Sequence, residues 1–373
     1  MTKISLLSAR AGLSKPAAGL SVSGLPTQSI GVVRDELGAW YDGGERVAYD
    51  PQLRALRAGD PSLRVFVRRE GDVAGAVTFL PGYPDGSSGW MSVLPHLPSA
   101  ATMPKLFLDY VGMGDSDKPS DYRVSTAERA DLVEALWREL GVRSTTVVAF
   151  DFSSLVVLEH LRRRLERAGR GEPEGGPVIR GVLIFNGGLF TDGHSHPWWT
   201  TPLLRRSGGW IARASANAPF PVFMMLADVM WSRRFPGRDK AGRRVYDSLH
   251  RHGGYDYLRR AAGFVADHKA EGERLDFGQL FLAFRRRFPF LVGGSDEDAF
   301  EHRQIDLAQK RVAQFGLEIA RLPGGHMTTD EEPAALADLI TTFEREKATS
   351  HVHGSPVVDP HVHVIPKGVL LYD

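Results

Sequence analysis

The chain has 373 residues, of which 42% are hydrophobic and 24% are charged, a composition typical of a globular α/β domain with an insertion or of two domains. Its formal net charge of +1 provides no overall basic field for nucleic acid or an anionic membrane, so we expect no nucleic-acid partner. The absence of cysteine excludes disulfides, thiolate nucleophiles and cysteine-based metal sites, and fits a reducing, cytoplasmic location.

The N-terminal segment is basic, because the first 34 residues contain Lys3, Arg10, Lys15 and Arg34 and no acidic residue. Residues 1–28 are predicted to form a flexible tail, and the alternative interpretation is an organellar leader. The segment lacks the continuous apolar stretch of a secretory signal. No apolar run in the chain approaches the roughly 18 residues of a membrane helix, so we expect no integral membrane span.

Residues 29–190 are predicted to form the first part of an α/β core. From about Leu37 the alternation of polar and apolar residues suggests edge strands around the Gly43–Gly44 turn, and an almost wholly apolar strand follows at Ala76–Leu80. Strands and helices then alternate, with strands expected at 105–109, 144–150 and 180–186 and helices at 125–140 and 152–165. Repeated strand–helix units predict a mostly parallel sheet flanked by helices.

The alternation stops at residue 191, and we expect an inserted helical cap over residues 191–287. This stretch has helical segments, four tryptophans and Phe- and Met-rich runs, but no convincing strand. The core is predicted to resume over residues 288–348, with strands at 289–294 and 317–322 and a closing helix at 331–346. Residues 349–373 are predicted to be a C-terminal tail.

The segment Val147–Leu155 is the most informative part of the sequence, because a β-branched strand passes abruptly into a helical pattern. Asp151 stands between them, with the small residues Ala149 and Ser153 two positions away on either side. This is the pattern of a nucleophile elbow, a tight turn whose apex side chain projects from the C-terminal edge of the sheet. A carboxylate nucleophile suits attack on an sp³ carbon that carries a leaving group or a strained ring oxygen.

Two later segments provide the partners that such a nucleophile needs. His326 follows Gly324–Gly325 after the last predicted strand, and Asp296 and Asp298 follow the strand at 289–294. The chain order of nucleophile, acid and histidine is that of the nucleophile-elbow enzymes. One of the two acids is expected to orient the imidazole and stabilise its positive charge; Asp298 is preferred for its position after the strand, and Asp296 stays open.

Three further residues are candidates for binding oxygen atoms of the substrate. The backbone N–H groups of Tyr83, in the loop after the strand at 76–80, and of Phe152, directly after the nucleophile, are expected to form an oxyanion hole. Asn186 ends another strand and either binds a substrate oxygen or leaving group, or is a turn asparagine. The tract His351–His363 either binds a metal through paired imidazoles or is a tail without catalytic duty; lacking a partner motif, it is predicted to be a tail, and no metal is expected.

Several motifs, in order along the chain, resemble the α/β-hydrolase superfamily in its epoxide hydrolase and haloalkane dehalogenase branch. They are Leu80–Trp90, Asp109–Pro119, Ala149–Ser153 and Gly324–Met327. The segment Phe185–His194 resembles the mesoderm-specific transcript subgroup more closely. The resemblance spans about residues 37–348 and is thin over the cap. It implies an α/β-hydrolase fold with a helical cap and an Asp–His–Asp catalytic triad that needs no cofactor.

The chain also departs from this branch at informative positions. Pro81 replaces the histidine that usually begins the oxyanion motif. Phe152 stands where dehalogenases commonly have a tryptophan, and Tyr83 stands where they have an asparagine. Both of these family residues hold the halide, so their loss argues against halide release. Epoxide hydrolases use cap tyrosines to protonate the epoxide oxygen, and the resemblance makes three residues candidates: Tyr246, Tyr255 and Tyr257.

We therefore expect an epoxide hydrolase-like enzyme that acts on a small hydrophobic substrate and water through an alkyl-enzyme ester at Asp151. The alternatives are a haloalkane dehalogenase-like hydrolase and a non-catalytic, hydrolase-like scaffold that binds a ligand or a partner. A serine esterase is disfavoured, because neither Ser153 nor Ser154 has small residues at both of the required offsets.

Overall fold

The computed structural model describes residues 27–57, 59, 62–119, 122, 124–195, 218–252, 271 and 274–348. These residues form an eight-stranded sheet with the order β1-β2-β4-β3-β5-β6-β7-β8. Strand β2 is antiparallel to β1 and to β4, and the other neighbours are parallel. The strands are β1 (Glu45–Tyr49), β2 (Leu63–Glu70), β3 (Val77–Leu80), β4 (Lys105–Leu108), β5 (Ser144–Phe150), β6 (Val178–Phe185), β7 (Phe290–Ser295) and β8 (Glu318–Leu322).

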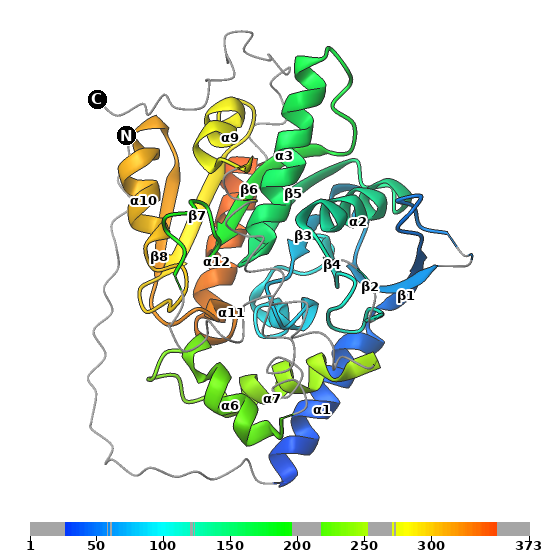
Figure 1. The fold of residues 1–373 in the computed structure, drawn as a ribbon, viewed down its shortest axis with the longest axis vertical. Helices are drawn as coiled ribbons and strands as arrows, with labels where there is room; N and C mark the ends of the chain where they lie inside the picture. Colours follow the sequence, from blue (N-terminus) through cyan, green and yellow to red (C-terminus); the bar gives the residue numbers. More distant parts are fainter. Residues whose placement is uncertain are drawn as a thin grey trace.

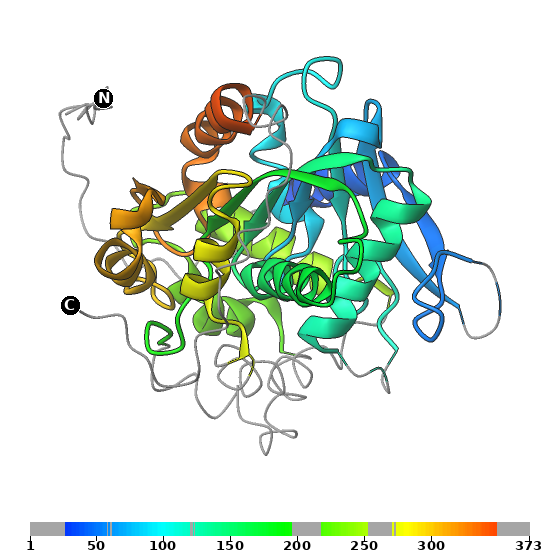
Figure 2. The same cartoon turned by 90° about the horizontal axis from the view of Figure 1, so that it is seen from above.

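Helices cover both faces of this sheet, with α2 and α3 on one face and α12 on the other (Figure 2). The core helices are α2 (Thr126–Glu139), α3 (Ser153–Gly169), α9 (Phe277–Phe284), α10 (Gln304–Arg311), α11 (Thr328–Glu331) and α12 (Pro333–Phe343). Short turns of other helix types are η1 (Val73–Gly75), η2 (Ser87–Trp90), η3 (Leu94–His96), η6 (Asp228–Met230), η8 (Ala313–Phe315) and η9 (Glu344–Ala348). The predicted α/β class, with its mostly parallel sheet flanked by helices, is confirmed.

The start of the core differs from the prediction, because residues 27–42 form the helix α1 (Thr27–Asp42) where strands were expected from Leu37. Val33, Leu37, Trp40 and Tyr41 are all buried, and their spacing places them on one face of a helix. The helix ends as the amide of Gly43 donates to the carbonyl of Ala39 at 3.2 Å. The expectation of a strand was wrong because a short window of alternating residues also fits one helical face.

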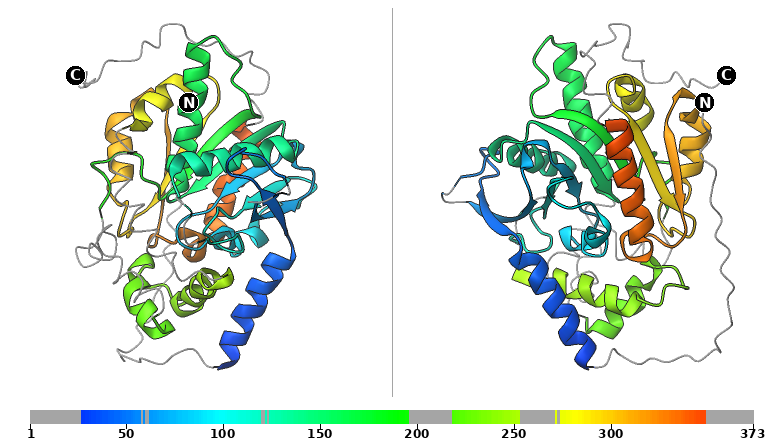
Figure 3. Two further views of the ribbon diagram at one scale, coloured as in Figure 1. Left: turned by 45° about the vertical axis from the view of Figure 1, so that its right-hand side comes forward. Right: turned by 180° about the vertical axis from the view of Figure 1, so that it is seen from behind.

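The described part of the segment predicted to be a cap is helical and lies beyond the C-terminal ends of the parallel strands (Figure 1). It comprises α6 (Phe220–Ala227), η6 and α7 (Arg238–Leu249), and α1 packs alongside α7 (Figure 3). Tyr255, Tyr257 and the tract His351–His363 lie outside the described residues. Among the described residues, no helix combines the length and the apolar character needed to cross a membrane.

Helix α9 fell inside the expected cap, but it packs against the core helix α3. The ring of Phe281 in α9 lies 5.4 Å, centroid to centroid, from the ring of Phe290 in β7. These contacts place α9 on the flank of the sheet. We therefore propose that the core resumes by Phe277 rather than at residue 288.

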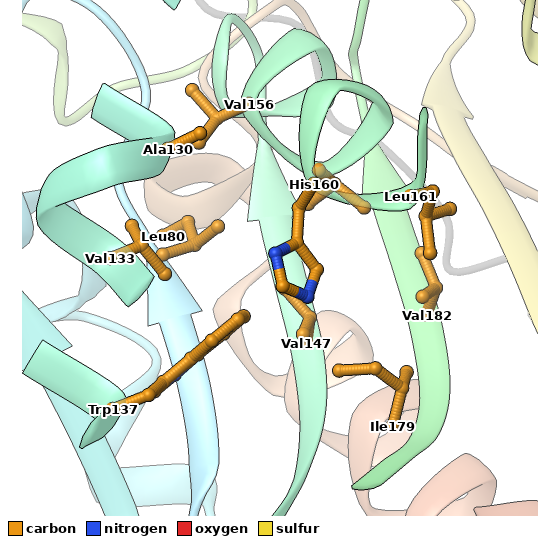
Figure 4. A pocket seen from close by; sticks show the side chains of 11 residues that line it. Leu80, Ala130, Val133, Trp137, Val147, Val156, His160, Leu161, Ile179 and Val182 are labelled. Atoms are coloured by element: carbon orange, nitrogen blue, oxygen red, sulfur yellow. The ribbon is translucent and has the colours of Figure 1, made fainter. Parts of the chain in front are cut away.

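Figure 4 shows His160 of α3 beside a small apolar void of about 10 Å³ between α2, α3 and the sheet. Nε of Arg164 donates to Nε2 of this imidazole at 2.9 Å, so Nδ1 carries the proton and donates to Glu134 at 2.9 Å. Burial lowers the pKa of His160 to about 4, and the positive charge of Arg164 contributes to the shift. The void is a feature of core packing, because His160 is its only titratable lining residue and is held in the neutral form.

Candidate active site

The turn between β5 and α3 places the side chain of Asp151 at the C-terminal edge of the sheet. Asp151 has a φ of +52°, a left-handed conformation that a residue other than glycine adopts only when the surrounding structure enforces it. Its amide donates to the carbonyl of Phe185 at 2.9 Å, which ties the turn to the end of β6. The side chain keeps 18% of its surface exposed, so the carboxylate is accessible at this edge.

The loop after β3 lies directly against this turn. Oγ of Ser153 donates to the carbonyl of Pro81 at 2.5 Å. Gly82 is required here, because a Cβ atom at this position would lie 2.4 Å from Cδ1 of Phe150 and 3.1 Å from Cβ of Asp151. This close approach allows the amide of Tyr83 to donate to Oδ2 of Asp151 at 2.8 Å. The small residue predicted two positions after Asp151 therefore has a second use, as an anchor for the loop.

Phe152 occupies the N-cap position of α3, and its backbone N–H belongs to the helix terminus beside Asp151. The buried guanidinium of Arg129 lies 4.6 Å from the centroid of the Phe152 ring. The Phe152 side chain thus faces into the protein. The backbone N–H is the only hydrogen-bond donor that a phenylalanine has. The two predicted oxyanion donors therefore come from the loop and helix terminus that flank the Asp151 side chain.

His326 joins two carboxylates from different parts of the chain. Its Nε2 lies 3.3 Å from Oδ1 of Asp151, and its Nδ1 lies 3.0 Å from both carboxylate oxygens of Asp298. Both His326 and Asp298 are buried. The amides of Phe300 and Glu301 donate to Oδ1 of Asp298 at 2.8 and 3.1 Å, which fixes this carboxylate against the ring.

The charges around His326 favour its protonated form. Burial alone lowers the pKa of this imidazole, but the negative charge of Asp298 and hydrogen bonds to Asp151 and Asp298 raise it well above its ordinary value. Burial raises the pKa of Asp298, but the positive charge of His326 and the hydrogen bonds from His326, Phe300 and Glu301 together outweigh that effect and hold the pKa below its ordinary value. The buried pair is therefore an imidazolium and a carboxylate when Asp151 carries its negative charge.

Asp296, the other acid considered from the sequence, points away from this cluster. Its side chain is 60% exposed and lies 3.8 Å from Nη1 of Arg321. The geometry thus favours Asp298 over Asp296 as the partner of His326.

Asn186 is buried and holds the loop of His326. Its Nδ2 donates to the carbonyl of His326 at 2.5 Å and to Oγ1 of Thr328 at 2.7 Å, while its Oδ1 accepts from the amide of Ser295 at 3.0 Å. These contacts join the ends of β6 and β7 to the segment that carries the imidazole. They favour a positioning role for Asn186 over the predicted contact with substrate.

The site combines a strand–turn–helix that carries a carboxylate at its apex, a histidine on a later loop and an acid after β7. A comparison with family models agrees with this arrangement over most of the chain. The sequence profile of the alpha/beta hydrolase family matches residues 79–339. The chain belongs to the alpha/beta hydrolase family. The fold class expected from the sequence is thereby confirmed, including the α/β-hydrolase architecture.

Three of the curated relatives are proteins of the subgroup that the motifs of this chain resemble. The mesoderm-specific transcript homolog protein of Bos taurus is 32% identical over 152 residues. The match spans 39% of this chain and 43% of that protein, so the chain matches less than half the length of these curated relatives.

Solved structures share the fold at low sequence identity. A thermophilic esterase from Thermogutta terrifontis has a TM-score of 0.59 at 15% identity, covering 81% of this chain and 98% of that chain. The epoxide hydrolase CorEH has a TM-score of 0.53 at 20% identity, covering 76% and 95%. Both likenesses concern the fold alone.

Tyr246 is the one candidate cap tyrosine of the hydrolase that the described residues include. Its hydroxyl donates to the carbonyl of Ala218 at 3.1 Å, and its ring packs against Phe220 and Phe223 within the cap. These contacts favour a packing role for Tyr246.

A second histidine, His194, lies close to the cluster of Asp151, His326 and Asp298 and was not singled out from the sequence. Nδ1 of His194 bonds to the carboxylate of Glu301, whose own amide donates to Asp298. Burial lowers the pKa of His194, but the bond to Glu301 and the negative charges of Glu301 and Asp151 raise it above its ordinary value. The only sequence signal for His194 is its place at the end of the segment that resembles the mesoderm-specific transcript subgroup.

The described residues also enclose a cavity of about 560 Å³ between α1, α7 and the loop that carries η2 and η3. Its walls include Trp40, Arg68, Lys240 and Arg244, and none of Asp151, Asp298 and His326 lines it. The cavity lies at the junction of cap and core rather than over Asp151.

Proposed function

We propose that this hydrolase opens epoxides with Asp151 as the nucleophile and releases a diol. The observation that carries the proposal is the double contact of the Asp151 carboxylate. Oδ2 accepts from the amide of Tyr83 at 2.8 Å, and Oδ1 lies 3.3 Å from Nε2 of His326. Oδ2 thus accepts the hydrogen bond that an oxyanion at this position would accept, and Oδ1 lies next to the imidazole that acts as the base.

The first step forms a bond between Oδ1 of Asp151 and an epoxide carbon, while the ring C–O bond breaks and its electron pair stays on oxygen. An acidic group of the cap supplies the proton to that oxygen, and Tyr255 and Tyr257 remain candidates for it. In the second step His326 takes a proton from water, and the resulting hydroxide attacks the ester carbon of Asp151. The tetrahedral intermediate then collapses: the bond between the ester carbon and Oδ1 breaks, the leaving alkoxide takes the proton from His326, and the diol departs as the Asp151 carboxylate is restored. The Tyr83 and Phe152 amides stabilise the charge on Oδ2, each with about 3 kcal/mol in comparable sites.

The electrostatics of the site explain how the imidazole is charged before the ester forms and acts as a base afterwards. The negative charge of Asp151 helps to raise the pKa of His326 in the resting enzyme. Ester formation removes that charge, so the pKa of the imidazole falls after the first step and the ring releases its proton to solvent. Asp298 keeps the ring oriented and stabilises it when it takes the proton from water. His326 thus becomes an effective base once the ester exists.

Serine chemistry at this turn is not supported by the geometry. Ser153 and Ser154 are both buried, and Oγ of Ser153 is bonded to the Pro81 carbonyl and lies 2.9 Å from the Tyr110 hydroxyl. Neither hydroxyl is presented at the sheet edge as the Asp151 carboxylate is.

Dehalogenation would use the same nucleophile, and it is the second candidate because the triad alone does not distinguish the two leaving groups. The Phe152 ring, stacked near Arg129, has no N–H with which to hold a halide. We therefore place epoxide opening first. Comparing diol formation from alkyl and aryl epoxides with halide release from chloro- and bromoalkanes separates the two.

The covalent ester is the feature to test. His326→Gln should retain the first step and lose the second, so incubation with a reactive epoxide should add the mass of one substrate to the protein. Asp151→Ala should show no adduct and no turnover, and Asp296→Asn serves as the matched acidic control. A single turnover in heavy-oxygen water should also place the label in the Asp151 side chain. Normal turnover by His326→Gln would overturn the scheme.

A further inference from the structure

The cap helix α7 carries a buried arginine that is bonded to two loops of the candidate active site. Nε of Arg244 donates to Oδ2 of Asp85 at 3.1 Å, and its Nη2 donates to Oδ2 of Asp330 at 3.2 Å. Two further bonds, from Nη2 to Asp85 and from Nη1 to Asp330, complete a fork on each side of the guanidinium. All three side chains are buried, with exposed fractions of 7% or less.

The two carboxylates lie close in sequence to the groups that contact Asp151. Asp85 is in the loop of Tyr83, two residues after it, and Asp330 is in α11, four residues after His326. Arg244 therefore connects the oxyanion loop and the histidine loop through a single side chain. The sequence separations of 159 and 86 residues show that this connection is made only by the fold.

Other bonds between cap and core reinforce the same two loops. On the oxyanion side, Oγ of Ser248 in α7 donates to the carbonyl of Asp85 at 2.7 Å. On the histidine side, Nε1 of Trp231 donates to Asp330 at 3.1 Å, and the amide of Met327 donates to the carbonyl of Met230 at 3.0 Å. Met327 directly follows the catalytic candidate His326.

The loop that carries His326 also approaches the cap so closely that position 325 has no room for a side chain. A Cβ atom at Gly325 would lie 2.5 Å from the amide nitrogen of Ser232. That amide and the amide of Gly325 both donate to Oε1 of Glu331 at 2.9 Å. The segment just before His326 is thus fixed against the cap by the backbone itself.

A buried cluster of one cation and two anions is a costly way to gain stability alone, because each charge must be removed from water. An arginine fork does, however, fix the direction and distance of two carboxylates at once, which an ammonium group cannot do. We propose that Arg244 is a positioning residue that sets the placement of the Tyr83 amide and the His326 imidazole around Asp151. The cap of this hydrolase is then part of the catalytic framework as well as a cover.

The role in turnover rests on the proposed function, but the coupling of the loops is testable without a substrate. Arg244→Lys keeps the charge and loses the fork. We expect amide hydrogen exchange to increase in both 83–90 and 323–331, segments that the side chain joins. The matched control is Arg243→Lys, one position away on the same helix, whose side chain pairs with Asp247 at 2.9 Å. That control should leave exchange in both segments unchanged.

With an epoxide that the wild-type protein turns over, Arg244→Lys should lower kcat by about 100-fold with a smaller change in KM, the effect of a misplacement of about 1 Å. The covalent ester should accumulate, because water activation by His326 depends on both loops. Exchange that rises no more in Arg244→Lys than in Arg243→Lys would overturn the inference. If wild-type protein turns over no epoxide while exchange changes as expected, the proposed function fails and the coupling stands.

Should Arg244→Lys fail to fold, the triple variant Asp85→Asn, Arg244→Gln, Asp330→Asn removes all three charges while retaining hydrogen-bonding groups. We expect it to fold and to show the same loss of loop protection. Wild-type protection in that variant would contradict a need for the guanidinium fork.

Discussion

Gly82 and Phe150 approach each other so closely that a Cβ atom at Gly82 would lie 2.4 Å from Cδ1 of the phenylalanine. This contact lets the loop after β3 reach the turn at Asp151 and brings the amide of Tyr83 to 2.8 Å from the Asp151 carboxylate. The aromatic ring is itself buried in the core, so it has little room to yield. The geometry of the proposed oxyanion site therefore depends on the absence of a side chain at Gly82.

Gly82→Ala is expected to push the loop away from Asp151 and remove one oxyanion donor. Loss of such a donor lowers turnover by about 100- to 1,000-fold in comparable sites. Steady-state kinetics with an epoxide substrate, alongside the melting temperature, provide the measurement. The control is Gly38→Ala in α1, where an added Cβ meets nothing within 4 Å. Equal kinetics for the two variants would count against the role of the Tyr83 amide.

Asp298→Asn is expected to leave the fold intact and to impair the second step. An amide beside Nδ1 no longer stabilises the imidazolium or enforces the productive tautomer, and the corresponding change in serine hydrolases lowers turnover by about 10,000-fold. Because ester formation needs no base, the adduct should accumulate and be visible by intact mass. Asp296→Asn, at an exposed position, should turn over as wild type; a large loss there instead would reassign the acid.

The strand–turn–helix at Asp151 could be predicted from the sequence because its signals are local. The small residues on either side of Asp151 and the change from strand to helical period lie within Val147–Leu155, and β5 has the predicted bounds of 144–150. The choice between Asp296 and Asp298 was not local. It depends on which carboxylate the loop after β7 directs inward, and two backbone amides decide that for Asp298.

Other parts of the site could not be read from the sequence for the same reason. Arg244 is one of many basic residues in a polar helix, and nothing near it in sequence identifies its partners 159 and 86 residues away. Asn186 had a correct position at the end of β6, but its bonds to the His326 loop arise only when β6 and β7 pair. Helix α1 was missed because a few alternating residues match a strand as well as one face of a helix.

The charge state of His326 should respond to both carboxylates. Asp298→Asn and Asp151→Asn each remove a negative charge that favours the imidazolium, so each is expected to lower the pKa of His326. The larger decrease should follow Asp298→Asn, because its charge is the largest contribution that raises this pKa. Titration of the imidazole by nuclear magnetic resonance measures both. A pKa that stays unchanged in Asp151→Asn would remove the basis for the switch in basicity on ester formation.

His160 should make the folded state sensitive to acid. The pKa of His160 is about 4 in the folded protein and 6.5, the ordinary value for histidine, in the unfolded chain. Between these two pH values the unfolded chain therefore binds more protons than the folded one. The contribution of His160 to stability is therefore complete above pH 6.5 and is lost as the pH falls towards 4. A difference of this size corresponds to about 3 kcal/mol in the free energy of unfolding.

His160→Gln removes this titration, so its free energy of unfolding should fall less steeply between pH 6.5 and 4 than that of the wild type. Denaturant unfolding at several pH values measures the two slopes, and the comparison cancels the other groups that titrate in this range. His96→Gln, at an exposed position in η3, should keep the wild-type slope. Parallel curves for His160→Gln and the wild type would mean that the ring takes up a proton inside the fold, against its hydrogen bond from Arg164.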